Sequence, residues 1–268
     1  MDIQSVLVSL EPRIAPTTLS IAVDIARRFR ATLTGLAAAE PSPMLLEGPA
    51  GIDQYSAARA ELEEALAVTK ADFEARVPHD LVRSFISIIE NPTQALRRES
   101  LASDLLIVEA RPGLLEYSAH PDIGELVLTT GRPVLALAPT AERLKAGNIV
   151  VAWKDTREAR RAIADALPFL RGADQVLVAT VDEGDYSSER ARLETIVSWL
   201  HLHGVPARGE VLPMGRSLAQ TVHNAAAAVG ADLIVAGGYG HSRFREWFLG
   251  GMTQDLLEQP ALNLFLSN

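Results

Sequence analysis

The stretch "ADLIVAGG", residues 231–238, is a continuous apolar run that begins after an aspartate and ends in two glycines. A close copy, "SDLLIVEA", occupies residues 103–110. Continuous apolar runs of this length are typical of parallel strands that helices cover on both faces. The pair predicts an α/β fold and points to an internal duplication.

Similar runs alternate with amphipathic segments along the whole chain, as in βα units around a parallel sheet. The alternation predicts two doubly wound, Rossmann-like domains in tandem, each with a five-stranded parallel sheet. The expected strands of the first half are 5–10, 31–39, 81–89, 104–110 and 133–139, and those of the second half are 148–153, 174–181, 207–214, 232–238 and 261–267.

The two halves correspond element by element. Asp104 corresponds to Asp232, and Pro133 of "RPVLAL" corresponds to Pro260 of "QPALNL". We therefore expect one domain at 1–142 and a second at 147–268. The first half is longer, and the Pro- and Gly-rich segment at about 41–55 accounts for the difference as an inserted loop.

The composition limits the classes of function. The 268 residues are 48% apolar and 22% charged, which is ordinary for a compact soluble protein. A net charge of −9 argues against a general nucleic-acid binder. Cysteine is absent, and no apolar run is long enough for a membrane span. We expect a cytoplasmic protein that binds neither nucleic acid nor membranes.

A glycine-rich loop follows the apolar run at 231–238. Gly237 and Gly240 lie shortly after the strand, and Gly250 opens a helix that carries Thr253 in its first turn. Backbone N–H groups at a helix start suit a phosphate, and glycine lets a ligand approach the backbone closely. From spacing alone, a phosphate site and a simple turn are both compatible with this loop.

The spacing Gly237-x2-Gly240-x9-Gly250, within this repeated frame, resembles the signature of the universal stress protein family. The resemblance covers the whole chain as two family-like, adenine-nucleotide-alpha-hydrolase-like domains. It implies a site for ATP or another adenine nucleotide, with or without Mg²⁺, in the second domain. The residues that it implicates are Ala152, Trp153, Lys154, Val181, Gly237, Gly240, Gly250, Gly251, Met252 and Thr253. Their positions in the same two loops add Asp155, His241 and Arg243.

Two departures from the family pattern leave the ligand open. Lys154 stands where nucleotide-binding members carry an acidic residue, although Asp155 follows it. Gly251 stands where they carry Ser or Thr, which removes one hydroxyl donor. Lys154 could instead attract a phosphate or another anion. His241 could face the phosphates or only solvent.

The first half lacks the glycine pattern. Its counterpart loop keeps Gly113 and Gly124, and the helix after it starts at Pro121–Asp122, where an acid would repel phosphate. Glu11 holds the acidic position after the first strand. We expect this site to be lost or to serve another ligand.

No catalytic or metal-binding constellation stands out. His201 and His203 are spaced i, i+2 and so point to different sides of a helix. We expect a non-enzymatic regulatory or binding module of the stress response. The alternatives are a slow ATPase and a structural scaffold without ligand.

The expected partners follow from the same reading. The last strands of the two halves should pair within one chain, and the chain could dimerise further. An unidentified protein partner would respond to the bound nucleotide.

Overall fold

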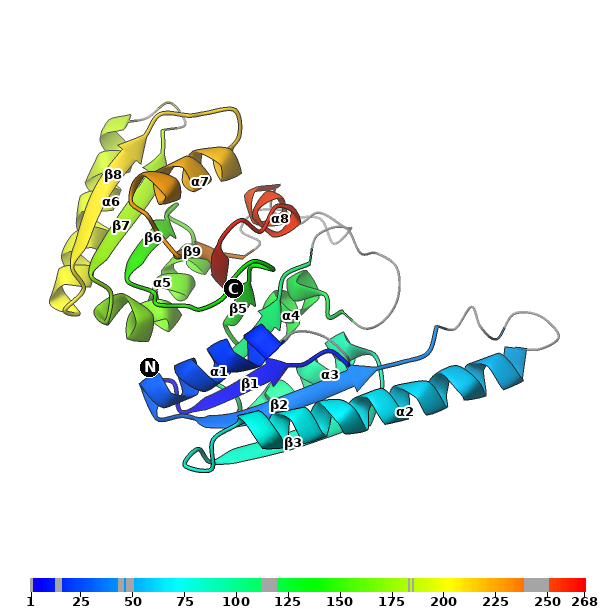
Figure 1. Cartoon of the computed structure of the whole chain (residues 1–268). Helices are drawn as coiled ribbons and strands as arrows, with labels where there is room; N and C mark the ends of the chain where they lie inside the picture. The colour runs from blue at the N-terminus through cyan, green and yellow to red at the C-terminus, as the bar shows by residue number, and fades with distance from the viewer. Residues whose placement is uncertain are drawn as a thin grey trace. The chain divides into compact units, whose positions relative to one another are not determined.

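The computed structural model describes residues 2–12, 16–42, 46, 51–111, 120–182, 184, 186–238 and 251–268. The described residues fall into two compact units, Ile3–Arg132 and Pro133–Asn268, and Asp2 belongs to the second (Figure 1). All ten expected strands are present, so the predicted α/β fold is confirmed.

The first unit is a four-stranded parallel sheet in the order β3-β2-β1-β4. Its strand order reverses between β1 and β4, which is the point where ligands bind in open parallel sheets. Its elements are β1 (Ser5–Ser9), α1 (Pro16–Phe29), β2 (Thr32–Ala39), α2 (Gly51–Arg76), β3 (Arg83–Ile89), α3 (Pro92–Glu99), η2 (Ser100–Ala102), β4 (Leu105–Glu109) and α4 (Ile123–Thr129).

The second unit has six strands in the order β5-β10-β9-β6-β7-β8, all parallel except for β5. Here the order reverses between β6 and β9. Its elements are β5 (Val134–Leu137), β6 (Asn148–Ala152), α5 (Arg157–Arg171), β7 (Gln175–Val181), α6 (Tyr186–Leu202), β8 (Ala207–Leu212), α7 (Leu218–Ala228), β9 (Leu233–Gly237), α8 (Gly251–Glu258) and β10 (Asn263–Ser267).

The boundary between the compact units falls earlier than the boundary between the sequence repeats. Strand β5 ends the first repeat, yet it pairs antiparallel with β10, with Leu135 opposite Phe265. The side chain of Asn263 reinforces this pairing, because its Oδ1 accepts from the Ala138 N–H at 3.1 Å. β5 therefore belongs to the unit that ends in β10.

The inserted segment is only partly a loop. Helix α2 begins at Gly51, so the expected loop at about 41–55 is wrong for its last five residues. The Pro and Gly residues stop at Gly51, and the alanines, glutamates and leucines that follow favour a helix.

The repeated aspartates have the same structural role in both halves. Asp104 Oδ2 accepts from the Gln4 and Ser5 N–H groups at 2.9 and 3.0 Å. Asp232 Oδ2 accepts from the Lys145 and Ala146 N–H groups at 3.0 and 2.8 Å. The aspartate before β4 therefore holds the backbone at the start of β1. In the same way, the aspartate before β9 holds the segment that leads into β6.

Candidate functional site

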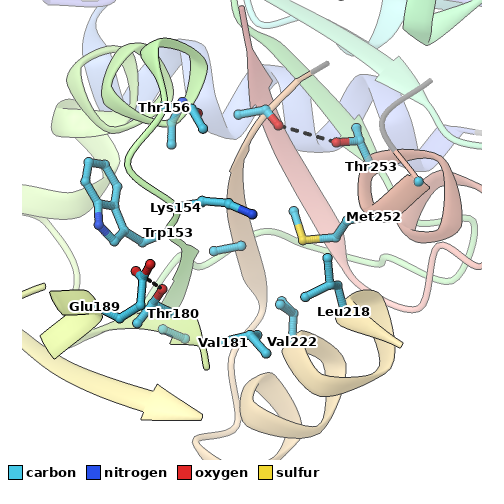
Figure 2. A pocket seen from close by; sticks show the side chains of 15 residues that line it. Trp153, Lys154, Thr156, Thr180, Val181, Glu189, Leu218, Val222, Met252 and Thr253 are labelled. Atoms are coloured by element: carbon cyan, nitrogen blue, oxygen red, sulfur yellow. Dashed lines mark hydrogen bonds between the residues drawn. The ribbon is translucent and has the colours of Figure 1, made fainter. Parts of the chain in front are cut away.

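A cavity of about 230 Å³ lies at the carboxyl ends of β6, β7 and β9, where the strand order of the second unit reverses (Figure 2). The starts of α5, α7 and α8 also reach it. Helix N-termini carry unsatisfied N–H groups and a partial positive charge, so this position suits an anion.

The structure brings together eight of the residues that the sequence implicates. They come from the ends of β6, β7 and β9 and from the first turn of α8. The eight that line the cavity are Ala152, Trp153, Lys154, Val181, Gly237, Gly251, Met252 and Thr253. Gly240, His241, Arg243 and Gly250 lie outside the described residues.

Asp155, in contrast, does not line the cavity. Its carboxylate pairs with Arg160 at 2.5 Å. The suggestion that Asp155 stands in for an acidic residue at position 154 is therefore not supported by its position. Lys154 is exposed, and its side chain extends into the space between β6 and α8 (Figure 2).

Gly237 is required by packing, whatever the cavity holds. A Cβ at this position would lie 2.5 Å from the backbone nitrogen of Ala159 and 2.6 Å from the carbonyl carbon of Glu158. Both atoms belong to the start of α5 and cannot move without moving the helix. The glycine after β9 thus allows α5 to approach the sheet.

Thr253 connects α8 to the end of β9. Its hydroxyl is buried and donates to the Gly237 carbonyl at 3.3 Å. The Thr253 hydroxyl can still accept a hydrogen bond, but its own hydrogen is already donated to the Gly237 carbonyl. At the start of α8, a Cβ on Gly251 would have no neighbour within 4 Å among the residues that the structure describes.

Sequence reasoning missed the carboxylate in this cavity. Glu189 lies in the first turn of α6 and lines the cavity with Thr180 at the end of β7. The Thr180 hydroxyl donates to Glu189 Oε2 at 3.4 Å, and Arg192 lies 3.3 Å from Oε1. The sequence signal that could have indicated Glu189 is an acidic residue in the first turn of the helix that follows β7.

The remaining lining residues form mainly apolar walls. Trp153 is almost fully buried, and its indole N–H has no hydrogen-bond partner within the described structure. Lining residues that were not predicted, besides Thr180 and Glu189, are Thr156, Ala159, Ala179, Leu218 and Val222. Thr156 caps α5 by accepting from the Ala159 N–H at 3.2 Å.

The equivalent place in the first unit is occupied by a cluster of charged side chains. Glu11 follows β1, and Glu109 ends β4. Arg111 lies between them, 3.4 Å from Glu11 and 3.0 Å from Glu109. His120 contacts the other oxygen of Glu11, and the Thr18 hydroxyl donates to Glu109 at 3.2 Å.

Burial sets the protonation of this cluster. The Glu11 side chain is 9% exposed, and burial raises its pKa to about 7 although Arg111 opposes the shift. Burial also lowers the pKa of His120. Nearby, Asp122 caps α4 by accepting from the Glu125 N–H at 3.0 Å, so an acid occupies this helix start as expected.

The histidine pair of α6 has structural contacts. His201 Nε2 lies 2.7 Å from the Ala207 carbonyl oxygen, and His203 Nδ1 lies 2.9 Å from that of Trp199. Across the described residues, no group of three or more His, Asp or Glu side chains could hold a metal ion. None of the described helices is long and apolar enough to cross a membrane.

The fold and this cavity define a class: a tandem pair of Rossmann-like repeats with a cavity at the switch point of the second. The sequence matches no protein-family model and no curated protein. In structure, the chain is similar to a universal stress protein from Archaeoglobus fulgidus DSM 4304. The TM-score is 0.69 at 13% identity, over 98% of both chains.

Two further solved structures resemble the full chain. One is described as a universal stress protein from Pseudomonas aeruginosa UCBPP-PA14, with a TM-score of 0.62 and 17% identity over 99% of this chain and 93% of that one. The other is the cytoplasmic domain of a prokaryotic cation chloride cotransporter, with a TM-score of 0.52 and 13% identity over 98% and 95%. The chain therefore has the universal stress protein fold in its two-domain form.

Proposed function

We propose that the protein is a universal stress protein whose second half binds ATP or a related adenine nucleotide. The observation that carries this proposal is the cavity at the β6/β9 switch point, where apolar walls meet three helix starts and Lys154. Apolar walls suit a base and sugar, while the helix starts and the ammonium group suit phosphates.

The size of the cavity favours a particular orientation. Pockets for small ligands usually measure about 300–1,000 Å³, and this cavity measures about 230 Å³. Because this volume is below that range, we place only the base and sugar between the apolar walls, with the phosphates extending past the start of α8. Any Mg²⁺ would then be held by the phosphates and water, outside the apolar part.

A titration of purified protein with ATP tests the proposal. We expect Lys154→Glu to weaken binding at least about tenfold, because an attractive charge becomes a repulsive one. Lys145→Glu is the matched control, since it makes the same change of charge at another exposed site of this unit. Wild-type protein that binds no adenine nucleotide would refute the proposal.

We also propose that the bound nucleotide is not turned over. Asp155, considered as a general base, faces Arg160 instead of the cavity. A steady-state phosphate-release assay is expected to give the same background for wild type and Asp155→Ala. Turnover that Asp155→Ala abolishes would establish the slow ATPase instead.

In this proposal the protein acts in the cytoplasm as a regulatory module. Nucleotide binding changes the surface at the carboxyl ends of the second-half strands, and a protein partner recognises that change. Self-association into a homodimer is part of the same proposal. Sedimentation with and without ATP tests the dimer, and a single sedimenting species of monomer mass would exclude it.

A further inference from the structure

The cavity of the second unit has chemically different ends. Glu189, Thr180 and Trp153 lie together on one side, and Met252 and Thr253 of α8 lie on the other (Figure 2). The first side offers a carboxylate, and the second offers the positive end of a helix. A ligand that matches both ends carries a hydrogen-bond donor at one end and an anion at the other.

The carboxylate of Glu189 is held in place by two contacts. Thr180, itself 2% exposed, donates to Oε2, and Arg192 lies beside Oε1. The Glu189 side chain is only 16% exposed. A carboxylate has about four acceptor positions, so the two contacts leave further positions for a ligand donor.

Glu189 is the one carboxylate among the described residues that line the cavity. An ionised carboxylate accepts hydrogen bonds and cannot donate them. Adenine presents an amino group at its position 6, whereas hypoxanthine and guanine present an oxygen there. A carboxylate attracts the amino group and repels the oxygen.

We propose that Glu189 is the residue that selects a 6-aminopurine, by accepting a hydrogen bond from the exocyclic amino group. This inference rests on the proposed nucleotide function. It makes Thr180 a positioning residue, because its hydroxyl orients the carboxylate. It also gives Lys154 a separate task, since an ammonium group cannot accept the amino hydrogen and serves the phosphates.

The test compares ATP with ITP, in which an oxygen replaces the amino group at position 6 of the purine and N1 carries a hydrogen. Wild-type protein should bind ATP about tenfold or more tightly than ITP, because a well-placed base contact discriminates by about that factor. In Glu189→Gln the amide can donate to the oxygen, so the preference should fall close to one. Glu189→Gln keeps the shape of the side chain and can still accept from Thr180.

Two further variants complete the experiment. Glu194→Gln changes an exposed acid of the same helix that pairs with Arg190, and it should leave the preference unchanged. Thr180→Val keeps the buried shape and should reduce the preference without abolishing ATP binding. Melting temperatures of all variants report on folding.

The outcomes separate the two proposals. Wild type that binds neither nucleotide overturns both the nucleotide function and the role of Glu189. Wild type that binds ATP and ITP equally, or a Glu189→Gln variant that keeps the full preference, overturns the role of Glu189 alone. Loss of preference in Glu189→Gln but not in Glu194→Gln supports it.

Discussion

The two halves of the chain place opposite chemistry at the same point of the fold. In the first half Glu11 follows β1 and Glu109 ends β4, and Arg111 contacts both carboxyl groups while His120 contacts Glu11. At the equivalent positions the second half has Lys154 and Gly237, and a cavity lies beside them.

This difference shows how a duplicated site can diverge without a change of scaffold. Strand order, the repeated aspartates and the side-chain caps of α3 and α7 are shared, while two substitutions change the local charge and volume. In the first half, side chains of the protein itself occupy this place and contact one another. Among the described residues that line the second-half cavity, the charged ones are Lys154 and Glu189.

The largest expected effect comes from adding volume at Gly237. Gly237→Ala places a Cβ 2.5 Å from the Ala159 backbone nitrogen, and we expect a loss of about 3 kcal/mol in unfolding free energy. Trp153, Trp199 and Trp247 all lie in the second half, so tryptophan fluorescence in urea measures this unit. Gly251→Ala is the control, because its Cβ meets no described atom within 4 Å. An unchanged midpoint for Gly237→Ala would contradict the packing argument.

The buried Glu11 predicts a pH dependence that is specific to the first half. Its folded-state pKa of about 7 lies above its ordinary value of 4.5, so the protonated form is the stable one in the fold. The unfolding free energy of the wild type, compared with that of Glu11→Gln, should therefore fall as the pH rises from about 4.5 to 7. The expected loss is up to about 3 kcal/mol, and it should persist at higher pH.

Urea unfolding followed by far-UV circular dichroism at several pH values measures this difference. The pKa of His120 is lowered by burial, so His120 acts in the opposite direction, with stability lost as the pH falls below its ordinary value of 6.5. Because His120 is present in both proteins, the difference between wild type and Glu11→Gln mainly reports the contribution of the Glu11 carboxyl group to stability. A difference that grows in the opposite direction would show that Glu11 is ionised and well paired.

The smallest expected effects come from the aspartates that the two halves share. Asp104→Ala and Asp232→Ala each leave two backbone N–H groups without their acceptor, and each should cost about 2 kcal/mol. Hydrogen exchange read separately for residues 3–132 and 133–268 measures the two costs. Costs that differ severalfold would contradict the equivalence of the repeats.

Much of the fold follows from the sequence, because each strand is a short apolar run between turn signals. The caps also follow from residue type, because Asn and Ser favour the N-cap position. Asn91 and Ser217 each cap a helix by accepting from N–H groups two or three residues further on. Gln220 follows Ser217 at the spacing of a capping box, but its side-chain amide donates to Asn224 instead.

The site was harder to predict than the fold. Residues that follow the strands, such as Lys154 and Val181, could be placed because strand ends meet at one edge. Glu189 lies on a helix, and only the packing of α6 near β7 brings it to the cavity. The contact between Glu11 and His120 joins residues far apart in the chain, and no local pattern indicates it.

The central claim is that one repeat retains a nucleotide site and the other has replaced it with its own charges. Calorimetric titration with ATP tests it through the stoichiometry. The account predicts one nucleotide per chain, lost in Leu218→Trp, which fills the second-half cavity, and kept in Glu11→Gln. Two nucleotides per chain, or binding that survives Leu218→Trp and disappears in Glu11→Gln, would contradict it.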